Sequence, residues 1–125
     1  MAEGSTCEIS RWQILKAQLN NLSAEEFHAA ISNDIADYLI IDVRTREEFE
    51  GDHIPEALHI DYLADGFWEK IESIPLDKPC YIYCRTGRRS TRVCTLMKNW
   101  GFTEVYNLGK GLVAYRAEFP SEQEV

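Results

Sequence analysis

The sequence predicts an α/β fold in which a mostly parallel central sheet is flanked by helices on both faces. Short apolar runs typical of strands alternate along the chain with amphipathic helical patterns, which is the order that parallel sheets require. One such run, residues 38–43, is apolar almost throughout, as in a strand covered on both faces. The length of 125 residues fits one domain, because most domains have roughly 100–150 residues.

Two helical patterns precede that strand. Apolar residues at helical spacing predict a short extra helix over residues 9–17. Ser23 is followed three residues later by Glu26, which is the pattern of a capping box. Leu22 and Phe27 occupy the positions of a hydrophobic staple around it, so a second helix is expected to begin after Ser23.

A second capping pattern follows the apolar run. Thr45 and Glu48 predict a short helix that ends near Gly51. Residues 57–60 are expected to form a brief strand, and the apolar spacing from Phe67 onward predicts another helix.

The C-terminal half repeats the alternation. Residues 80–84 form an aromatic-rich run that predicts a strand, and we expect a helix to follow from near Ser90 through Trp100. Residues 105–108 predict another short strand, and a last helix is expected to end before Pro120.

The composition excludes several function classes. A formal net charge of −8 argues against nucleic acid and anionic membranes as partners. No run approaches the ~20 apolar residues of a membrane span, and the first twenty residues lack the apolar centre of an export signal. Four irregularly spaced cysteines do not make a disulfide scaffold. We therefore expect a cytoplasmic protein with reduced thiols.

The segment after Cys84 carries the strongest chemical signal. Cys84 ends a predicted strand, and ligands of open parallel sheets bind beyond the carboxyl ends of the strands. Gly87 permits a turn that other residues resist. If the loop curls, its backbone N–H groups form an anion-binding nest, to which the following helix start adds its own donors. A thiol at the centre of such a nest is expected to ionise readily.

The charge of this segment points the same way. Four arginines and no acidic residue lie between positions 84 and 92, within an otherwise acidic chain. Screening acts over about 8 Å at physiological salt, so an anion in the loop would respond mainly to this local cationic cluster. The alternative interpretation is a surface helix start whose arginines point into solvent, and the agreement of cysteine, glycine, strand end and arginines argues against it.

Three motifs in order resemble those of one family. The loop Cys84-Arg85-Thr86-Gly87-Arg88-Arg89-Ser90 is similar to the active-site loop of rhodanese sulfurtransferases, a cysteine, four residues and an arginine. The upstream and terminal signatures of that family resemble Asp42-Val43-Arg44, Glu48-Phe49, His53-Ile54-Pro55, Asn107-Leu108-Gly109 and Phe119-Pro120. The resemblance implies a rhodanese-like domain over residues 19–120, with residues 1–18 as an N-terminal extension and 121–125 as a polar tail.

The resemblance also implies a mechanism and roles for the loop. The Cys84 thiolate would attack the outer sulfur of a small anionic donor such as thiosulfate, and the resulting persulfide would pass its sulfur to a thiol, cyanide or a protein. Arg89 would support the loop and its charge. Arg85 and Arg88 would meet the donor, because a guanidinium group matches an oxyanion. The remaining residues implied at the substrate site are Thr86, Gly87 and Ser90. No metal or cofactor is implied, and the sequence carries no prediction of oligomeric state.

Two other functions remain open from the sequence. Cysteine-loop phosphatases and arsenate reductases resemble this family but place five residues between cysteine and arginine, whereas Cys84 and Arg89 are separated by four. A relay module that passes sulfur only to a partner protein would use the same persulfide chemistry and is not excluded by any motif.

The other cysteines and polar residues are expected to have structural roles. Cys80 is interpreted as an inert buried side chain, and Cys94 as part of the core rather than as a resolving thiol for Cys84. His53 and His59 are expected to make structural hydrogen bonds, and His28 to be exposed on its helix. The remaining scaffold residues, expected to fix a strand end, are Asp42 and Arg44.

One departure from the family pattern concerns the backbone around His53-Ile54-Pro55. Asp52 and Glu56 occupy positions where the family usually has glycine. An aspartate at position 52 tolerates a left-handed backbone better than most residues.

Overall fold

The computed structural model describes residues 11–33 and 37–121. Cys7, the first two residues of the helix expected over 9–17, and the tail from residue 122 lie outside the described residues. The expected helix begins at Arg11 and ends at Ala17. Within the described part of the chain, no helix is long and apolar enough to cross a membrane.

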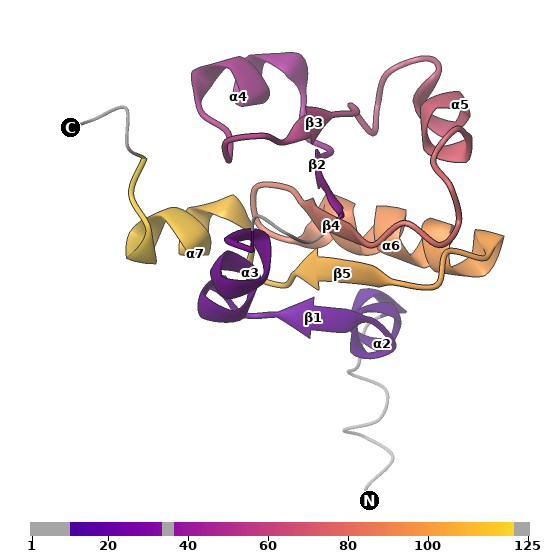
Figure 1. The fold of residues 1–125 in the computed structure, drawn as a ribbon, viewed down its shortest axis with the longest axis horizontal. Coiled ribbons are helices and arrows are strands. Elements are labelled where there is room, and N and C mark those ends of the chain that lie inside the picture. Colours follow the sequence, from indigo (N-terminus) through magenta and orange to yellow (C-terminus); the bar gives the residue numbers. More distant parts are fainter. Residues whose placement is uncertain (1–10, 34–36, 122–125) are drawn as a thin grey trace, which may run out of the picture.

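A five-stranded parallel sheet forms the centre of the molecule, which confirms the predicted fold class (Figure 1). The strands lie in the order β1-β5-β4-β2-β3, so β4 occupies the middle. Their bounds are Asn20–Leu22 (β1), Leu39–Asp42 (β2), Leu58–His59 (β3), Cys80–Tyr83 (β4) and Val105–Leu108 (β5).

Helices cover both faces of this sheet. Helices α3 and α7 pack on one face, and α5 and α6 on the other, with α2 beside α6. Helix α4 follows the carboxyl end of β2. The helices extend over Arg11–Ala17 (α2), Ala24–Ile31 (α3), Arg46–Gly51 (α4), Phe67–Glu72 (α5), Arg88–Trp100 (α6) and Gly111–Glu118 (α7).

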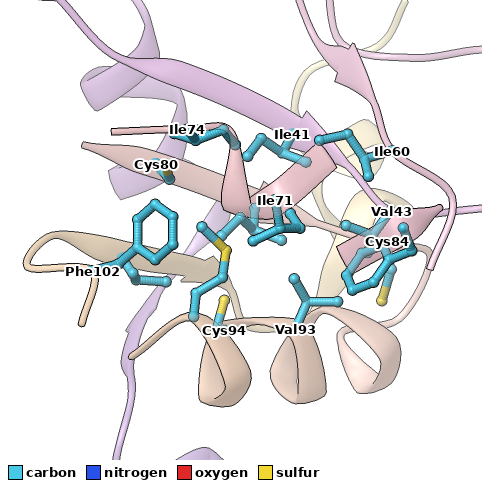
Figure 2. Packing of buried hydrophobic residues seen from close by; sticks show 14 residues of the cluster. Ile41, Val43, Ile60, Ile71, Ile74, Cys80, Cys84, Val93, Cys94 and Phe102 are labelled. Atoms are coloured by element: carbon cyan, nitrogen blue, oxygen red, sulfur yellow. The ribbon is translucent and has the colours of Figure 1, made fainter. Parts of the chain in front are cut away.

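Alternating side chains of the strands build two apolar cores. Ile41 and Ile82 point toward α5 and α6, and Figure 2 shows Ile41 in this core with Val93 and Cys94. Ile40 and Tyr83 point to the opposite face, toward α3 and α7. Strands buried on both faces explain why their sequences are apolar almost throughout.

Both predicted capping boxes are present. The hydroxyl of Ser23 accepts a hydrogen bond from the backbone of Glu26, whose carboxylate accepts one from the backbone of Ser23. Thr45 and Glu48 make the same reciprocal pair at the start of α4.

Two features of the chain path differ from the expectations. Strand β1 was not predicted, because its residues Asn20 and Asn21 are polar and exposed at the edge of the sheet. Helix α6 begins at Arg88 rather than near Ser90. The left-handed backbone of Gly87 (φ 99°) turns the chain directly into the helix, so the loop between β4 and α6 comprises only residues 84–87.

His28 is half-buried, and the expectation that it is exposed was wrong. Its ring stacks on Phe119 with 3.9 Å between ring centroids, and its Nδ1 lies 2.9 Å from the Tyr115 hydroxyl. The histidine thus connects α3 to the end of α7, a long-range contact that the helical pattern of α3 alone does not reveal.

Candidate active site

The loop after β4 closes around the sulfur of Cys84. Cys84 Sγ accepts hydrogen bonds from the backbone N–H of Gly87 at 3.1 Å and from that of Ser90 at 3.3 Å. The first donor belongs to the loop and the second to the first turn of α6. Main-chain donors directed at one atom are the arrangement that stabilises negative charge there.

Two hydroxyl groups complete the surroundings of the loop. The Ser90 hydroxyl lies 3.4 Å from Cys84 Sγ and 3.2 Å from the carbonyl oxygen of Gly87. The Thr91 hydroxyl donates to the same carbonyl at 2.7 Å. Both side chains are buried, so these contacts hold Gly87 in the conformation that directs its N–H to the sulfur.

A glycine-containing turn supports the loop from the side of β5. The main-chain N–H groups of Leu112 and Val113 donate to the carbonyls of Cys84 and Arg85, at 2.8 and 3.1 Å. Gly111 has φ 78°, and a Cβ placed on it would lie 2.2 Å from the Arg85 carbonyl oxygen. The loop and the start of α7 can approach this closely only because position 111 has no side chain.

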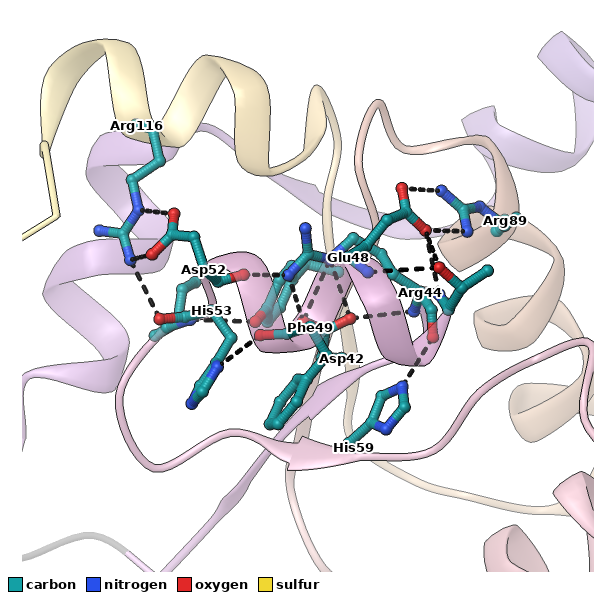
Figure 3. A network of polar contacts seen from close by, with 12 residues as sticks. Asp42, Arg44, Glu48, Phe49, Asp52, His53, His59, Arg89 and Arg116 are labelled. Atoms are coloured by element: carbon teal, nitrogen blue, oxygen red, sulfur yellow. Dashed lines mark hydrogen bonds and ion pairs between the residues drawn. The ribbon is translucent and has the colours of Figure 1, made fainter.

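The Arg89 side chain is anchored by Glu48. Its Nη1 and Nη2 donate to Glu48 Oε1 and Oε2 at 2.8 and 3.0 Å, as Figure 3 shows. The hydrogen bonds from Arg89 lower the pKa of Glu48 to about 2, and burial opposes this only in part. Because Glu48 also caps α4 through Thr45, the ion pair joins the first turn of α6 to α4.

A second network lies beside this pair at the carboxyl end of β2 (Figure 3). Arg44 Nε and Nη2 donate to the buried carboxylate of Asp42, and Nη2 also donates to the carbonyl of Asp52. Arg116 of α7 donates to both oxygens of Asp52, at 2.8 and 3.1 Å. The structural role expected of Asp42 and Arg44 is confirmed by these contacts.

The two histidines of the upstream motif are structural, as predicted. His53 Nδ1 lies 2.8 Å from the carbonyl of Phe49, and His59 Nε2 lies 2.8 Å from that of Arg44. Both rings stack on Phe49. The left-handed residue of this region is Glu56 (φ 74°), whereas Asp52 is extended (φ −172°) because its carboxylate and carbonyl are held by the two arginines.

The remaining arginines of the motif lie at the surface. Arg85, Thr86 and Arg88 are exposed. Arg85 borders a cavity of about 280 Å³ next to the loop, but Arg88 does not line it. The cavity is lined by Arg44, Glu48, Asp52, Arg85, Leu112, Val113 and Arg116.

A larger cavity lies elsewhere. Its volume is about 1050 Å³, and it is lined by residues of α3, α7 and the segment 53–56, with no residue of the cysteine loop. The candidate site is therefore chosen by the main-chain donors to Cys84 Sγ and not by the volume of a cavity.

The other described cysteines lie in the core. Cys80 and Cys94 are fully buried, as expected from the sequence. Burial raises the pKa of Cys80 to about 12, and it raises that of Cys94 well above its usual range. Among the residues that the structure describes, no main-chain N–H donates to either of these sulfurs, in contrast to Cys84. In the described ranges, no group of three or more His, Cys, Asp and Glu side chains is placed to hold a metal ion.

Several contacts that shape the site were not predicted from the sequence. Glu48 was predicted only as a capping residue of the helix after Thr45, and nothing in the sequence pairs it with Arg89 or places Gly111 against Arg85. Thr91 and Lys16 carried no signal, because a threonine inside a helix and a lysine in an extension are ordinary features.

Comparisons with known proteins agree with this geometry. The family model of the rhodanese-like domain matches residues 23–118. The "Thiosulfate sulfurtransferase GlpE" of Pseudomonas syringae pv. syringae is 31% identical over 84 residues, which cover 67% of this chain and 77% of that protein. A "Sulfurtransferase" of Allochromatium vinosum is 31% identical over 97 residues, covering 78% of this chain and 88% of that protein.

Solved structures of similar fold include rhodanese-like proteins. A rhodanese-like domain protein from Staphylococcus aureus superposes with a TM-score of 0.68 at 26% identity, covering 78% of this chain and 91% of the other. The polysulfide-sulfur transferase homodimer of Wolinella succinogenes gives a TM-score of 0.74 at 19% identity, covering 95% of this chain and 89% of the other.

Proposed function

The chain belongs to the rhodanese-like domain family, and on that basis we propose that it is a sulfurtransferase that carries sulfane sulfur on Cys84. The observation that supports this proposal most directly is the pair of main-chain donors on Cys84 Sγ. Main-chain donors of this loop also suit a persulfide anion, whose charge lies mainly on the terminal sulfur, one S–S bond beyond Sγ.

The proposed reaction has two steps. The Cys84 thiolate attacks the outer sulfur of thiosulfate, the S–S bond of the donor breaks, and sulfite leaves with the bonding electron pair. The resulting Cys84 persulfide anion then gives its terminal sulfur to a nucleophile such as cyanide or a thiolate, and the Cys84 thiolate is restored. The transferred sulfur stays at the sulfane level in both steps, and each leaving group keeps the bonding electron pair, so no outside oxidant or reductant is required.

The burial of Cys84 limits which donors fit. Cys84 is only 1% exposed, so a donor has to enter beside the loop 84–87 to reach the sulfur. Arg85, a residue of this loop, lines the cavity of about 280 Å³. We propose that this cavity receives a small anionic donor and that Arg85 binds its oxyanion end, since a guanidinium group matches that geometry.

Mass spectrometry of the intact protein tests the covalent step. After incubation with thiosulfate, we expect a gain of one sulfur atom, about 32 Da, that cyanide removes. Cys84→Ser should show no gain, whereas Cys80→Ala, which removes another buried thiol, should behave as the unmodified protein does. A gain that persists in Cys84→Ser would contradict the assignment.

The acceptor class separates an enzyme from a relay module. Rapid thiocyanate formation from the isolated Cys84 persulfide and cyanide supports the enzyme, whereas transfer only to a protein thiol supports the relay. An aryl phosphate assayed in parallel should not be hydrolysed, and hydrolysis that depends on Cys84 would favour a phosphatase instead.

A further inference from the structure

Helix α2 precedes the residues that match the family model, yet its Lys16 side chain contacts Gly109, which packs against the cysteine loop. The Lys16 ammonium donates a hydrogen bond of 2.6 Å to the carbonyl oxygen of Gly109. Lys16 is half-buried there, and the methylene carbon next to its ammonium is 3.7 Å from the position of a Cβ on Gly109. The contact joins positions 93 residues apart and is part of how α2 is held on the molecule.

The Gly109 carbonyl is in direct contact with the loop around Cys84. A Cβ built on Gly87 would lie 2.3 Å from this carbonyl oxygen, so the two backbones are packed together without space for a side chain. The N–H of Gly87 is one of the two main-chain donors to Cys84 Sγ. Lys16 therefore fixes a carbonyl that in turn limits where Gly87 can move.

A second chain of hydrogen bonds leads from the Lys16 backbone to Gly87. The Lys16 carbonyl accepts from the Asn21 side chain at 2.6 Å, and Asn21 Oδ1 accepts from Asn107 Nδ2 at 2.9 Å. Asn107 Nδ2 also donates to the Thr91 hydroxyl at 3.2 Å, and that hydroxyl donates to the Gly87 carbonyl. Asn107 and Thr91 are fully buried, so this inner part of the chain is shielded from competing water, whereas Asn21 at its outer end is exposed.

The charge of Lys16 interacts with the site as well. Burial lowers the pKa of Lys16, the neighbouring Lys110 lowers it further, and the Cys84 sulfur raises it. The pKa of Arg89 is raised, mainly by its hydrogen bonds to Glu48 and to a smaller extent by Cys84. The charges of Lys16 on α2 and Arg89 on α6 thus both interact favourably with a negative charge at Cys84.

We propose that Lys16 is a positioning residue for the Cys84 loop, and that the helix preceding the family domain is therefore part of the functional site. Lys16 acts through Gly109 and Gly87, and it does not touch the reacting sulfur itself. The effect on sulfur transfer rests on the function proposed above, whereas the effect on the reactivity of Cys84 does not.

The test compares Lys16→Met with two controls. Arg11→Met removes the same charge from an exposed position of the same helix. Lys16→Arg keeps the cation and a donor for the Gly109 carbonyl. Each variant is first checked for folding by urea unfolding, so that a loss of the native state is not mistaken for a loss of positioning.

The first measurement is the rate of Cys84 alkylation by iodoacetamide as a function of pH. We expect the half-maximal rate of Lys16→Met to move to higher pH and its rate at pH 7 to fall about three- to tenfold, as for loss of one ordinary hydrogen bond. Arg11→Met should follow the unmodified protein, and Lys16→Arg should recover most of the loss. Coincident profiles for Lys16→Met and the unmodified protein would overturn the proposal, as would an equal change in Arg11→Met.

The second measurement is steady-state sulfur transfer from thiosulfate to cyanide. A positioning role predicts that Lys16→Met lowers kcat by a similar factor with little change in KM, whereas a rise in KM alone would assign Lys16 to donor binding and overturn the positioning role. If the unmodified protein transfers no sulfur, the proposed function fails, but the alkylation profiles still decide the role of Lys16.

Discussion

Glu48 and Arg89, 41 positions apart in the sequence, form a bidentate ion pair that connects the first turn of α6 to the first turn of α4. Their side chains are 26% and 27% exposed, so the pair is partly shielded from solvent. The pair therefore anchors the arginine that ends the family motif, on the helix that also carries Ser90, to the start of α4.

Replacing Glu48 by glutamine should destabilise the protein and slow sulfur transfer. The substitution leaves the Arg89 charge without its carboxylate and weakens the capping box of α4. For a partly exposed charged pair, we expect a loss of about 1–2 kcal/mol in the free energy of unfolding, measured in urea at pH 7. A double-mutant cycle with Arg89→Met isolates the pair. A coupling energy indistinguishable from zero would show that the two side chains contribute independently.

The same pair predicts a dependence of stability on pH. The pKa of Glu48 in the folded protein is lowered from 4.5 to about 2, first by the hydrogen bonds from Arg89. A lowered folded-state pKa contributes stability above the unfolded pKa, and this stability is lost as the pH falls through the folded one. The difference in unfolding free energy between the unmodified protein and Glu48→Gln should thus be constant above about pH 5 and shrink toward pH 2. A difference that stays constant down to pH 2 contradicts this assignment.

The sequence was sufficient to predict the fold class because the strands are buried on both faces. Their apolar runs and the two capping boxes at Ser23 and Thr45 are local signals, and the structure contains all of them. Strand β1 lacks such a signal. It is three residues long, polar and at the edge, and it exists because its backbone pairs with β5, a partner more than eighty residues away.

The candidate site was predictable where its chemistry is local and not where it depends on packing. Cys84 and Gly87 could be identified from the loop alone, because a cysteine, a glycine and a following helix lie within a few positions. The ion pair of Arg89, the close approach of Gly111 to Arg85 and the reach of Lys16 connect segments distant in sequence. His28 was misjudged for the same reason, since its partners Tyr115 and Phe119 come from α7.

Two glycines with similar backbone angles should respond differently to alanine. Gly111 (φ 78°) would place its Cβ 2.2 Å from the Arg85 carbonyl oxygen, whereas a Cβ on Gly66 (φ 82°) would have nothing within 4 Å. Both substitutions carry backbone strain of order 1 kcal/mol. Only Gly111→Ala must also displace the cysteine loop, so we expect it to lower the rate of Cys84 persulfide formation by at least about tenfold. Gly66→Ala should retain the rate. Equal rates in the two variants would mean that the loop tolerates the displacement.

The three described cysteines should differ in reactivity although all are buried. With the pKa of Cys80 raised to about 12, only roughly one thiol in ten thousand is ionised at pH 8, and burial raises the pKa of Cys94 strongly too. Cys84 differs because main-chain donors surround its sulfur at the end of β4.

We therefore expect iodoacetamide at pH 8 to label Cys84 while Cys80 and Cys94 remain unmodified, as measured by peptide mapping of a Cys7→Ser background. The same mapping after peroxide treatment should show no crosslink between Cys84 and Cys94, because the Cys94 side chain projects from α6 into the core and is fully buried (Figure 2). Labelling of Cys94 in the folded protein, or formation of that crosslink, would mean that α6 opens readily and that Cys94 participates as a second thiol.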